Sequence, residues 1–501
     1  TAMTTGVENT IIGGLAGDAL TTGGYNVAVG FRALSTEDAH GYNVALGYQA
    51  LNVQDAGANA ANVAVGFNAG GGITTGINNI TMGGYAGDGL TTGSYNIAIG
   101  HNALSAEDAH GRNVAIGQEA LRYQDAGADA YNVAIGFNTG GAITTGTGNT
   151  LIGGQAGDAL TTGGFNTAVG KSALSTEDAH GYCTAVGYQA LMTQDAGADA
   201  LNTAVGFDAG GDITTGTNNT LMGHEAGNAL TTGSYNIAIG KGALGAEDAH
   251  GRNVAIGHQA LTNQDAGADA YNVAVGFYAG EAISTGVNNV LIGGEAGDAI
   301  TTGGENIAIG RQALSAKTIG SGDVAIGHQA LQDADGGDAF NVAVGYRAGR
   351  NITSGIRNIL IGASAGDTLT AGLDNIAIGY QALATEDDHS YNTAVGHQAL
   401  KAQDAGADAY NVAMGYRAGY AVTSGVNNIT MGAEAGIALT TGSYNVAVGH
   451  GALATEDTGG QNVAIGVNAL NTLNYAGNGM NVAVGYNAGN AMTSGINNTL
   501  V

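Results

Sequence analysis

Paired aspartates are the residues of this sequence whose type and spacing best suit a chemical role. The segments around Asp38 and Asp55 read Glu-Asp-Ala-His and Gln-Asp-Ala-Gly, and both recur along the chain at a regular spacing. If the members of a pair stack on adjacent strands about 4.8 Å apart, they repel each other by roughly 3.5 kcal/mol at an effective dielectric constant of 20. The candidate pairs are Asp38 and Asp55, Asp108 and Asp125, Asp178 and Asp195, Asp248 and Asp265, and Asp387 and Asp404.

These pairs admit two interpretations. One is a divalent cation, with Ca²⁺ as the first candidate, held by the paired carboxylates, the neighbouring Glu and turn carbonyls. The other, which the sequence favours, is a solvated acidic surface that keeps the protein soluble and blocks lateral association. Equivalent segments carry Lys317-Thr318 and Asn474 instead of the acids. No cofactor is therefore required in every segment, and Ca²⁺ is an optional ligand.

Histidine follows the same spacing. Beside Glu37 and Asp38, His40 could ligate a transition metal. Only one imidazole serves each group, however, and this is more typical of a solvent-exposed turn histidine. The equivalent histidines are His40, His110, His180, His250 and His389.

The sequence indicates no enzyme. No Ser-His-Asp or Cys-His combination stands apart from the repeated segments, and an acid–base pair present in many copies is unlike an active site. Consecutive Thr pairs, Thr74-Thr75 and Thr91-Thr92, are similar to the ladders of ice-binding proteins. Acidic segments interrupt these ladders, so ice binding is a minor alternative.

One motif organises the whole chain: Asn, three small or β-branched residues, Gly, two variable residues, Ala, then Leu or Gly. Its first copies begin at Asn9, Asn26, Asn43 and Asn62, and this set of four returns with a constant period, except that the fifth set is one residue shorter. We number each unit from its Asn as offset zero. We expect residues 1–501 to form one continuous solenoid of 28 coils in seven sets, and to be a segment of a longer chain. The sets begin at Asn9, Asn79, Asn149, Asn219, Asn289, Asn358 and Asn428.

A unit of about 17–19 residues is too short for a domain or a helical hairpin. Its Val-Ala-Val or Ile-Ala-Ile core alternates and is β-branched, which predicts a strand, and the rest is rich in turn residues. The sequence therefore predicts an all-β parallel β-solenoid with one coil per unit. Two columns are expected to be structural: Asn26, Asn43 and Asn62 in a hydrogen-bonded ladder, and Gly30, Gly47 and Gly66 at a positive φ. Cys183 interrupts the Asn column and is expected to be a half-buried substitute.

The alternation also predicts which side chains face inward. We expect Val27 and Val29, at offsets one and three, to form an aliphatic stack inside the coil. Ala28 would then lie on the opposite face, where a second protein surface could pack closely. This expectation favours a symmetric homotrimer, with end-to-end association into a filament as a further option.

Composition excludes several other classes. The chain has 501 residues, with 90 Gly, no Pro, one Cys, 13 Lys and Arg, 41 Asp and Glu, and a net charge of −28. So few basic residues argue against nucleic-acid binding, and a single Cys excludes a disulfide framework. No apolar stretch is long enough for a membrane span, so we expect no membrane insertion.

The repeated pentapeptide also carries a family resemblance. It reads Asn96-Ile-Ala-Ile-Gly100, Asn113-Val-Ala-Ile-Gly117 and Asn306-Ile-Ala-Ile-Gly310. This pattern resembles the head repeats of trimeric autotransporter adhesins of the Yersinia adhesin type, and it is similar to repeats of phage tail-fibre proteins. The resemblance covers essentially the whole chain and implies a left-handed parallel β-roll that trimerises. The coils here are longer than in that family, and we expect the extra residues to form a projecting turn.

The repeats and the resemblance together predict an extracellular structural protein. The first expectation is the shaft of a phage tail or virion fibre that projects toward a host surface for attachment. The alternative is a bacterial trimeric cell-surface adhesin or a secreted filament. The expected partners are other copies of this chain, and a host or surface receptor that binds regions outside this segment.

Overall fold

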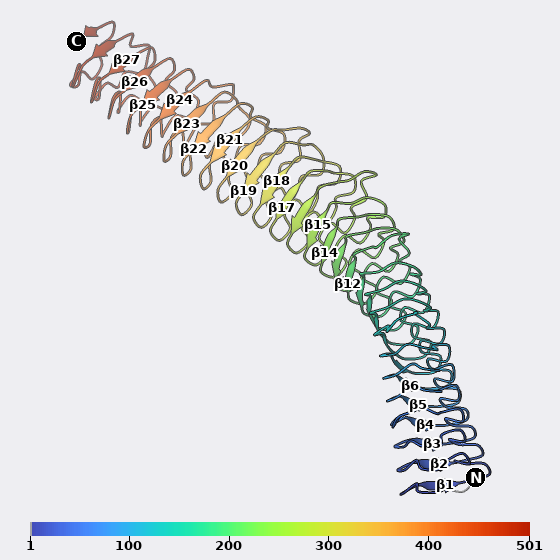
Figure 1. Cartoon of the computed structure of the whole chain (residues 1–501). Coiled ribbons are helices and arrows are strands. Elements are labelled where there is room, and N and C mark those ends of the chain that lie inside the picture. The colour runs from blue at the N-terminus through green and yellow to red at the C-terminus, as the bar shows by residue number, and fades with distance from the viewer. Residues whose placement is uncertain (1–2) are drawn as a thin grey trace. The chain divides into compact units, whose positions relative to one another are not determined.

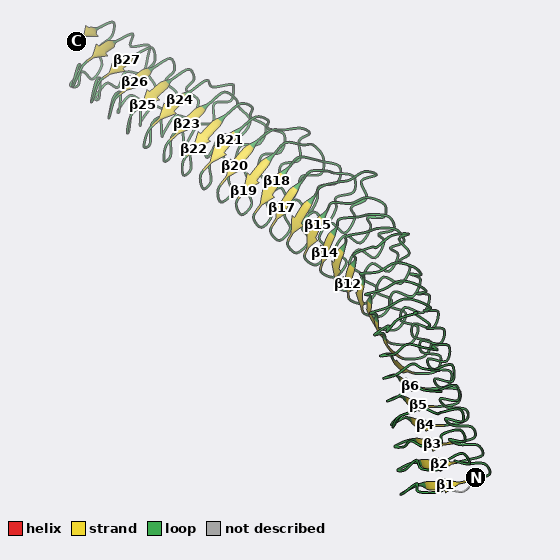
Figure 2. Cartoon of the chain, in the orientation of Figure 1, coloured by secondary structure: helices red, strands yellow, loops and turns green. Residues whose placement is uncertain are grey.

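The predicted all-β parallel β-solenoid is confirmed by the computed structural model, which describes residues 3–501. The chain forms two compact units, Thr1–Arg252 and Asn253–Val501. None of residues 3–501 lies in a helix, so no helix in this part of the chain could cross a membrane. Figure 2 shows that each coil contains one short strand and that loops and turns make up the rest.

Fourteen of the strands belong to the first unit, and each begins directly after the residue at offset zero. They are β1 (Thr10–Ile12), β2 (Val27–Val29), β3 (Val44–Leu46), β4 (Val63–Val65), β5 (Ile80–Met82), β6 (Ile97–Ile99), β7 (Val114–Ile116), β8 (Val133–Ile135), β9 (Thr150–Ile152), β10 (Thr167–Val169), β11 (Thr184–Val186), β12 (Thr203–Val205), β13 (Thr220–Met222) and β14 (Ile237–Ile239).

The second unit repeats this pattern with strands β15 to β29. They are β15 (Val254–Ile256), β16 (Val273–Val275), β17 (Val290–Ile292), β18 (Ile307–Ile309), β19 (Val324–Ile326), β20 (Val342–Val344), β21 (Ile359–Ile361), β22 (Ile376–Ile378), β23 (Thr393–Val395), β24 (Val412–Met414), β25 (Ile429–Met431), β26 (Val446–Val448), β27 (Val463–Ile465), β28 (Val482–Val484) and β29 (Thr499–Leu500).

Consecutive strands within each unit pair in parallel and in register. Val27 of β2 lies opposite Val44 of β3, and Ala28 lies opposite Ala45. Figure 1 shows the labelled strands β1 to β6 following one another as successive rungs. The ladder continues outside the strands, where the Gly30 N–H donates to the Ile12 carbonyl at 2.8 Å. Every offset therefore becomes a column of equivalent residues.

The Asn column is a hydrogen-bonded ladder, as predicted. The backbone N–H of Asn43 donates to Oδ1 of Asn26 at 3.0 Å, and the N–H of Asn62 donates to Oδ1 of Asn43 at 3.1 Å. Cys183 occupies the same position, with its own N–H bonded to Asn166 Oδ1. It is fully buried rather than half-buried, and desolvation raises the pKa of its thiol to about 12. A thiol this hard to ionise is a poor nucleophile.

The Gly column is equally constrained. Gly30 has a φ of 134°, and a Cβ there would lie 2.3 Å from the Gly47 carbonyl oxygen of the next coil. Gly47 and Gly66 have φ angles of 142° and 138°. Both the left-handed backbone and the close approach of the next coil exclude a side chain. The predicted structural role of these glycines is confirmed.

The prediction of the inward face was wrong. Ala28 is 0% exposed and lies in the apolar core with Ala33 and Leu34, whereas Val27 and Val29 are only half-buried and face outward. The reason is the width of a coil this short. Its interior admits only a small residue at offset two when Leu34 fills the space beside it. The face that lacks a partner is therefore aliphatic, not alanine-rich.

Size complementarity fills the interior between coils. The first coil of the third set has the larger Leu151 at offset two, and Gly140 and Gly157 stand at offset eight in the preceding coil and in the same coil. A Cβ on either glycine would lie 2.8 to 3.0 Å from a Leu151 methyl group. Because glycine has no side chain, Gly140 and Gly157 at offset eight leave space for Leu151 at offset two.

Offset eleven is a further interior column, and it is not uniformly apolar. In the first set it contains Leu20, Glu37, Gln54 and Ile73, all of them buried. Gln54 is fully hydrogen-bonded, because its Oε1 accepts from Asn62 Nδ2 at 2.6 Å and its Nε2 donates to the Thr74 carbonyl at 3.1 Å. Polar side chains thus alternate with apolar ones inside the solenoid.

The fifth set replaces this arrangement with an ion pair. Lys317 stands where the other sets have Glu, and Asp323 stands where they have Asn or, in the third set, Cys183. The Lys317 Nζ lies 2.8 Å from Asp323 Oδ2, and both side chains are completely buried. Nζ also donates to the carbonyls of Gly336 at 3.0 Å and Gly337 at 3.2 Å. The two departures from the repeat compensate each other electrostatically.

We predict that Lys317→Met destabilises these coils by about 3–5 kcal/mol, because the Asp323 carboxylate stays buried without a counter-charge. The double variant Lys317→Glu, Asp323→Asn restores the residues of the other sets and should recover most of that loss. Hydrogen exchange of peptides from residues 306–341 measures the local effect, with the exposed Lys241→Met as control. Equal destabilisation by the single and double variants would contradict the compensation.

Candidate functional site

The acidic turns after neighbouring strands converge into small groups of potential metal ligands. Glu37, Asp38 and His40 come from the turn after β2, and Asp55 comes from the turn after β3. One donor atom of each lies within 4.8 Å of the other three. We call such a cluster an EDHD group. The others described here are Glu107, Asp108, His110 and Asp125; Glu177, Asp178, His180 and Asp195; and Glu386, Asp387, His389 and Asp404.

The structure thus brings together the two aspartates of four predicted pairs. The members of the fifth predicted pair lie in different units: Asp248 is in the first and Asp265 is in the second. The paired aspartates are exposed, whereas the Glu is buried and the His is half-buried. The acids are therefore not one solvated surface, because the innermost member of each group lies inside the coil.

Glu37 is the innermost member of its group. Its side chain is 0% exposed and lies in the interior column at offset eleven. Its Oε1 accepts a hydrogen bond from the backbone N–H of His40 at 3.0 Å, while Oε2 has no partner. Glu107 and Glu177 repeat both features. The signal was present in the sequence, because Leu, Glu, Gln and Ile alternate at this offset and the apolar members mark the column as interior.

Burial changes the acidity of these groups. Desolvation raises the pKa of Glu37 and Glu177, opposed by the hydrogen bonds and charges of His40 and His180. The pKa of Glu107 rises to about 7 through desolvation, against the hydrogen bond from His110 and with the added repulsion of Asp125. Burial therefore disfavours the ionised form of all three carboxyls, and the Glu107 carboxyl favours a proton up to about pH 7.

The histidine ring completes each group. His40 Nδ1 lies 3.5 Å from Glu37 Oε1, and the equivalent distances are 3.8 Å for His110 and 3.5 Å for His180. These three Nδ1 atoms are buried and have no hydrogen-bond partner. The group at Glu386 is closed instead, because His389 Nδ1 lies at hydrogen-bond distance, 2.8 Å, from Glu386 Oε1.

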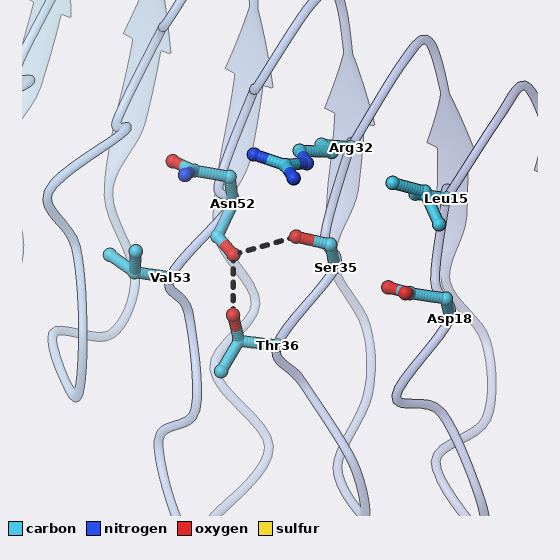
Figure 3. Close-up of a pocket in the computed structure, with 7 residues that line it drawn as sticks. All are labelled: Leu15, Asp18, Arg32, Ser35, Thr36, Asn52 and Val53. Atoms are coloured by element: carbon cyan, nitrogen blue, oxygen red, sulfur yellow. Dashed lines mark hydrogen bonds between the residues drawn. The ribbon is translucent and has the colours of Figure 1, made fainter. Parts of the chain in front are cut away.

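A shallow hollow beside the first coils offers less chemistry. It has a volume of about 330 Å³ and is lined by Leu15, Asp18, Arg32, Ser35, Thr36, Asn52 and Val53. Figure 3 shows the hydroxyls of Ser35 and Thr36 converging on one oxygen, the Asn52 carbonyl, at 3.0 and 2.6 Å. These hydroxyls are donors to backbone, so neither is arranged as a nucleophile.

Exposed aromatic side chains on consecutive coils form ladders in which neighbouring rings stack on one another. Phe31, Tyr48 and Phe67 stack with ring centroids 5.5 and 5.2 Å apart. Because each ring covers the face of the next, the inner rings present only their edges to a ligand. The ladders act as surface packing between coils.

We predict that Glu107→Gln removes a pH-dependent cost. The folded-state pKa of Glu107 is raised from 4.5 to about 7, so its stabilising contribution is complete below pH 4.5 and is lost as the pH rises through about 7. Relative to wild type, the Gln variant should gain stability between pH 5 and pH 8, by up to about 3 kcal/mol. Hydrogen exchange of residues 96–132 in metal-free buffer measures this.

The exposed Glu305→Gln is the control for that experiment. It should leave the pH dependence of the same peptides unchanged. A Glu107→Gln variant that parallels wild type from pH 5 to pH 8 would contradict a buried, destabilising carboxylate.

Comparison with known proteins adds no family to this picture. The sequence matches no protein-family model, and it has no significant match among curated proteins. The arguments on function therefore rest on the repeats and on the geometry of the coils.

Proposed function

We propose that this chain is a structural fibre shaft, most simply part of a phage tail or virion fibre that projects toward a host surface for attachment. The observation that carries the proposal is the distribution of functional groups. The apolar face recurs from coil to coil and the acids and histidines recur in most of the sets, whereas an enzyme concentrates its functional groups at one place. Stacked repeats make an elongated object, which suits a shaft.

Self-association is the second part of the proposal, with a homotrimer as the favoured state. Each strand directs two uncharged side chains outward, as Val114 and Ile116 do in β7, and no strand from β1 to β29 carries a charged residue. Exposed apolar patches beyond roughly a few hundred Å² mark interaction sites on soluble proteins. A face that repeats with the coils suits a partner with the same repeat, which is another copy of this chain.

The alternative is a bacterial trimeric cell-surface adhesin or a secreted filament, because the same shaft would serve either. Ice binding is less well supported. The Thr74 hydroxyl donates to the Thr91 carbonyl at 3.1 Å, and the Thr91 hydroxyl donates to the Asp108 carbonyl at 2.8 Å. These hydroxyls bind the next coil rather than a surface outside the protein.

We predict that charging the strand face disrupts association. The variant Val44→Lys, Val114→Lys, Thr184→Lys, Val254→Lys places one Lys on the outward face of four coils. Light scattering after size-exclusion chromatography should report a trimer for wild type and a smaller species for the variant. The matched control, Ala58→Lys, Ala128→Lys, Ala198→Lys, Ala268→Lys, charges exposed turn residues of the same coils and should remain trimeric. A monomeric wild type would overturn the trimer.

Localisation tests the fibre itself. Antibodies raised against the chain should label thin appendages of virions in immunogold electron micrographs. Labelling of bacterial cell surfaces would favour the adhesin, and labelling confined to the cell interior would contradict both.

A further inference from the structure

In three of the EDHD groups, those of Glu37, Glu107 and Glu177, the buried carboxylate differs from other polar residues at its offset in being incompletely partnered. Gln54 uses both ends of its amide in hydrogen bonds. Glu456 occupies the same offset in the seventh set, and its Oε1 and Oε2 accept from the backbone N–H groups of Gly459 at 2.7 Å and Tyr475 at 3.3 Å. Glu37, Glu107 and Glu177 each retain a buried oxygen without a partner.

The Glu456 coil is informative because it lacks the rest of the group. Gly459 stands at the position of His40, and Asn474 stands at the position of Asp55. There the carboxylate accepts a backbone hydrogen bond at each of its two oxygens. In the groups of Glu37, Glu107 and Glu177, where they are present, the carboxylate is left short of a partner and the His Nδ1 is left without one. In these three groups an unpartnered carboxylate oxygen and an unpartnered imidazole nitrogen therefore belong to one cluster, together with two aspartates.

The fifth set shows what resolves such a shortage. In that set Lys317 occupies the same offset, and its buried Nζ supplies a positive charge from the chain itself. The EDHD groups contain three carboxylates and no Lys or Arg. A cation from solution would play the part that Lys317 plays in its coil.

The donor set indicates the kind of cation. One imidazole nitrogen and three carboxylate oxygens suit a four-coordinate ion of the Zn²⁺ type, whose ligand bonds of about 2.0–2.2 Å place donor atoms roughly 3.3 Å apart. The donor atoms of each group already lie within 4.8 Å of one another, and the two aspartates are on exposed turns that can move inward. Ca²⁺ is bound by oxygen ligands alone, so the imidazole nitrogen in each group favours a transition metal over Ca²⁺.

We propose that the EDHD groups are binding sites for a divalent transition metal of the Zn²⁺ type, so that the chain carries a regular series of metal ions along its length. In each site Glu37 or its equivalent is the interior ligand, the His Nδ1 is the nitrogen ligand, and the two aspartates close the site from the surface. The ion would join two consecutive coils, because Asp55 belongs to the coil after Glu37. This proposal does not depend on the fibre function.

Equilibrium dialysis of the metal-free full chain against Zn²⁺ at pH 7.5, with excess Ca²⁺ present, tests the proposal. At least four Zn²⁺ per chain should bind. Replacing Zn²⁺ by Co²⁺ should give the intense visible absorption of a tetrahedral site. The variant His40→Ala, His110→Ala, His180→Ala, His389→Ala should lose four bound ions, or bind them at least about tenfold more weakly.

The chain offers a matched control. His101→Ala, His258→Ala, His328→Ala, His450→Ala removes the same number of imidazoles from outside the groups and should retain the full stoichiometry. A second variant, Asp38→Asn, Asp108→Asn, Asp178→Asn, Asp387→Asn, changes only exposed side chains. It should also lose Zn²⁺, while circular dichroism verifies that it folds.

Three results would overturn the proposal. The first is the absence of saturable Zn²⁺ binding to the folded wild type. The second is an equal loss of Zn²⁺ in the cluster and control His variants. The third is stoichiometric binding of Ca²⁺ that the cluster His variant retains, which would indicate an oxygen-only site. A trimeric fibre that binds no Zn²⁺ would refute the metal sites and leave the proposed function intact.

Discussion

Parallel, in-register hydrogen bonding between consecutive coils determines which residues of the solenoid contact each other. Because each coil repeats the path of the one before, a residue at a given offset contacts its own equivalents above and below. Favourable pairs, such as the Asn ladder, are thereby multiplied. Unfavourable pairs are multiplied too. A polar or charged side chain at an interior offset therefore needs a hydrogen bond or a counter-charge in every coil that contains it. The hydrogen-bonded Gln54 and the ion-paired Lys317 are two ways in which this need is met at offset eleven.

The repeat made the fold readable from the sequence. Period, strand position, Gly column and Asn column all followed from spacing and residue type, because each is a local demand repeated many times. Which face of the strand points into the coil did not follow from the sequence. Alternation shows that Val27 and Ala28 point to opposite sides, but not which side is inside. That depends on the width of the coil, which turn residues set. Leu34 and Arg32 take φ angles of 48° and 60°, and nothing in their residue types indicates a left-handed backbone.

The candidate site was predicted in part for a related reason. The spacing placed Asp38 near Asp55, and the structure brings both into one group. The Glu-Asp-Ala-His segment by itself indicates that Glu37 is a surface acid beside Asp38, but Glu37 lies at the same offset as the buried Leu20 and Ile73. Comparing residues down a column, rather than along the chain, identifies it as interior. The burial that raises its pKa, and the unpartnered atoms around it, are properties of the packed coil that residue types do not encode.

The Lys317–Asp323 pair limits how one repeat can diverge from the others. Starting from Glu and Asn, a change to Lys alone buries an ammonium without its carboxylate, and a change to Asp alone places two carboxylates together inside the coil. Either intermediate carries an uncompensated buried charge. Polar interior positions therefore couple substitutions at offsets eleven and zero, and such coils change in steps of two.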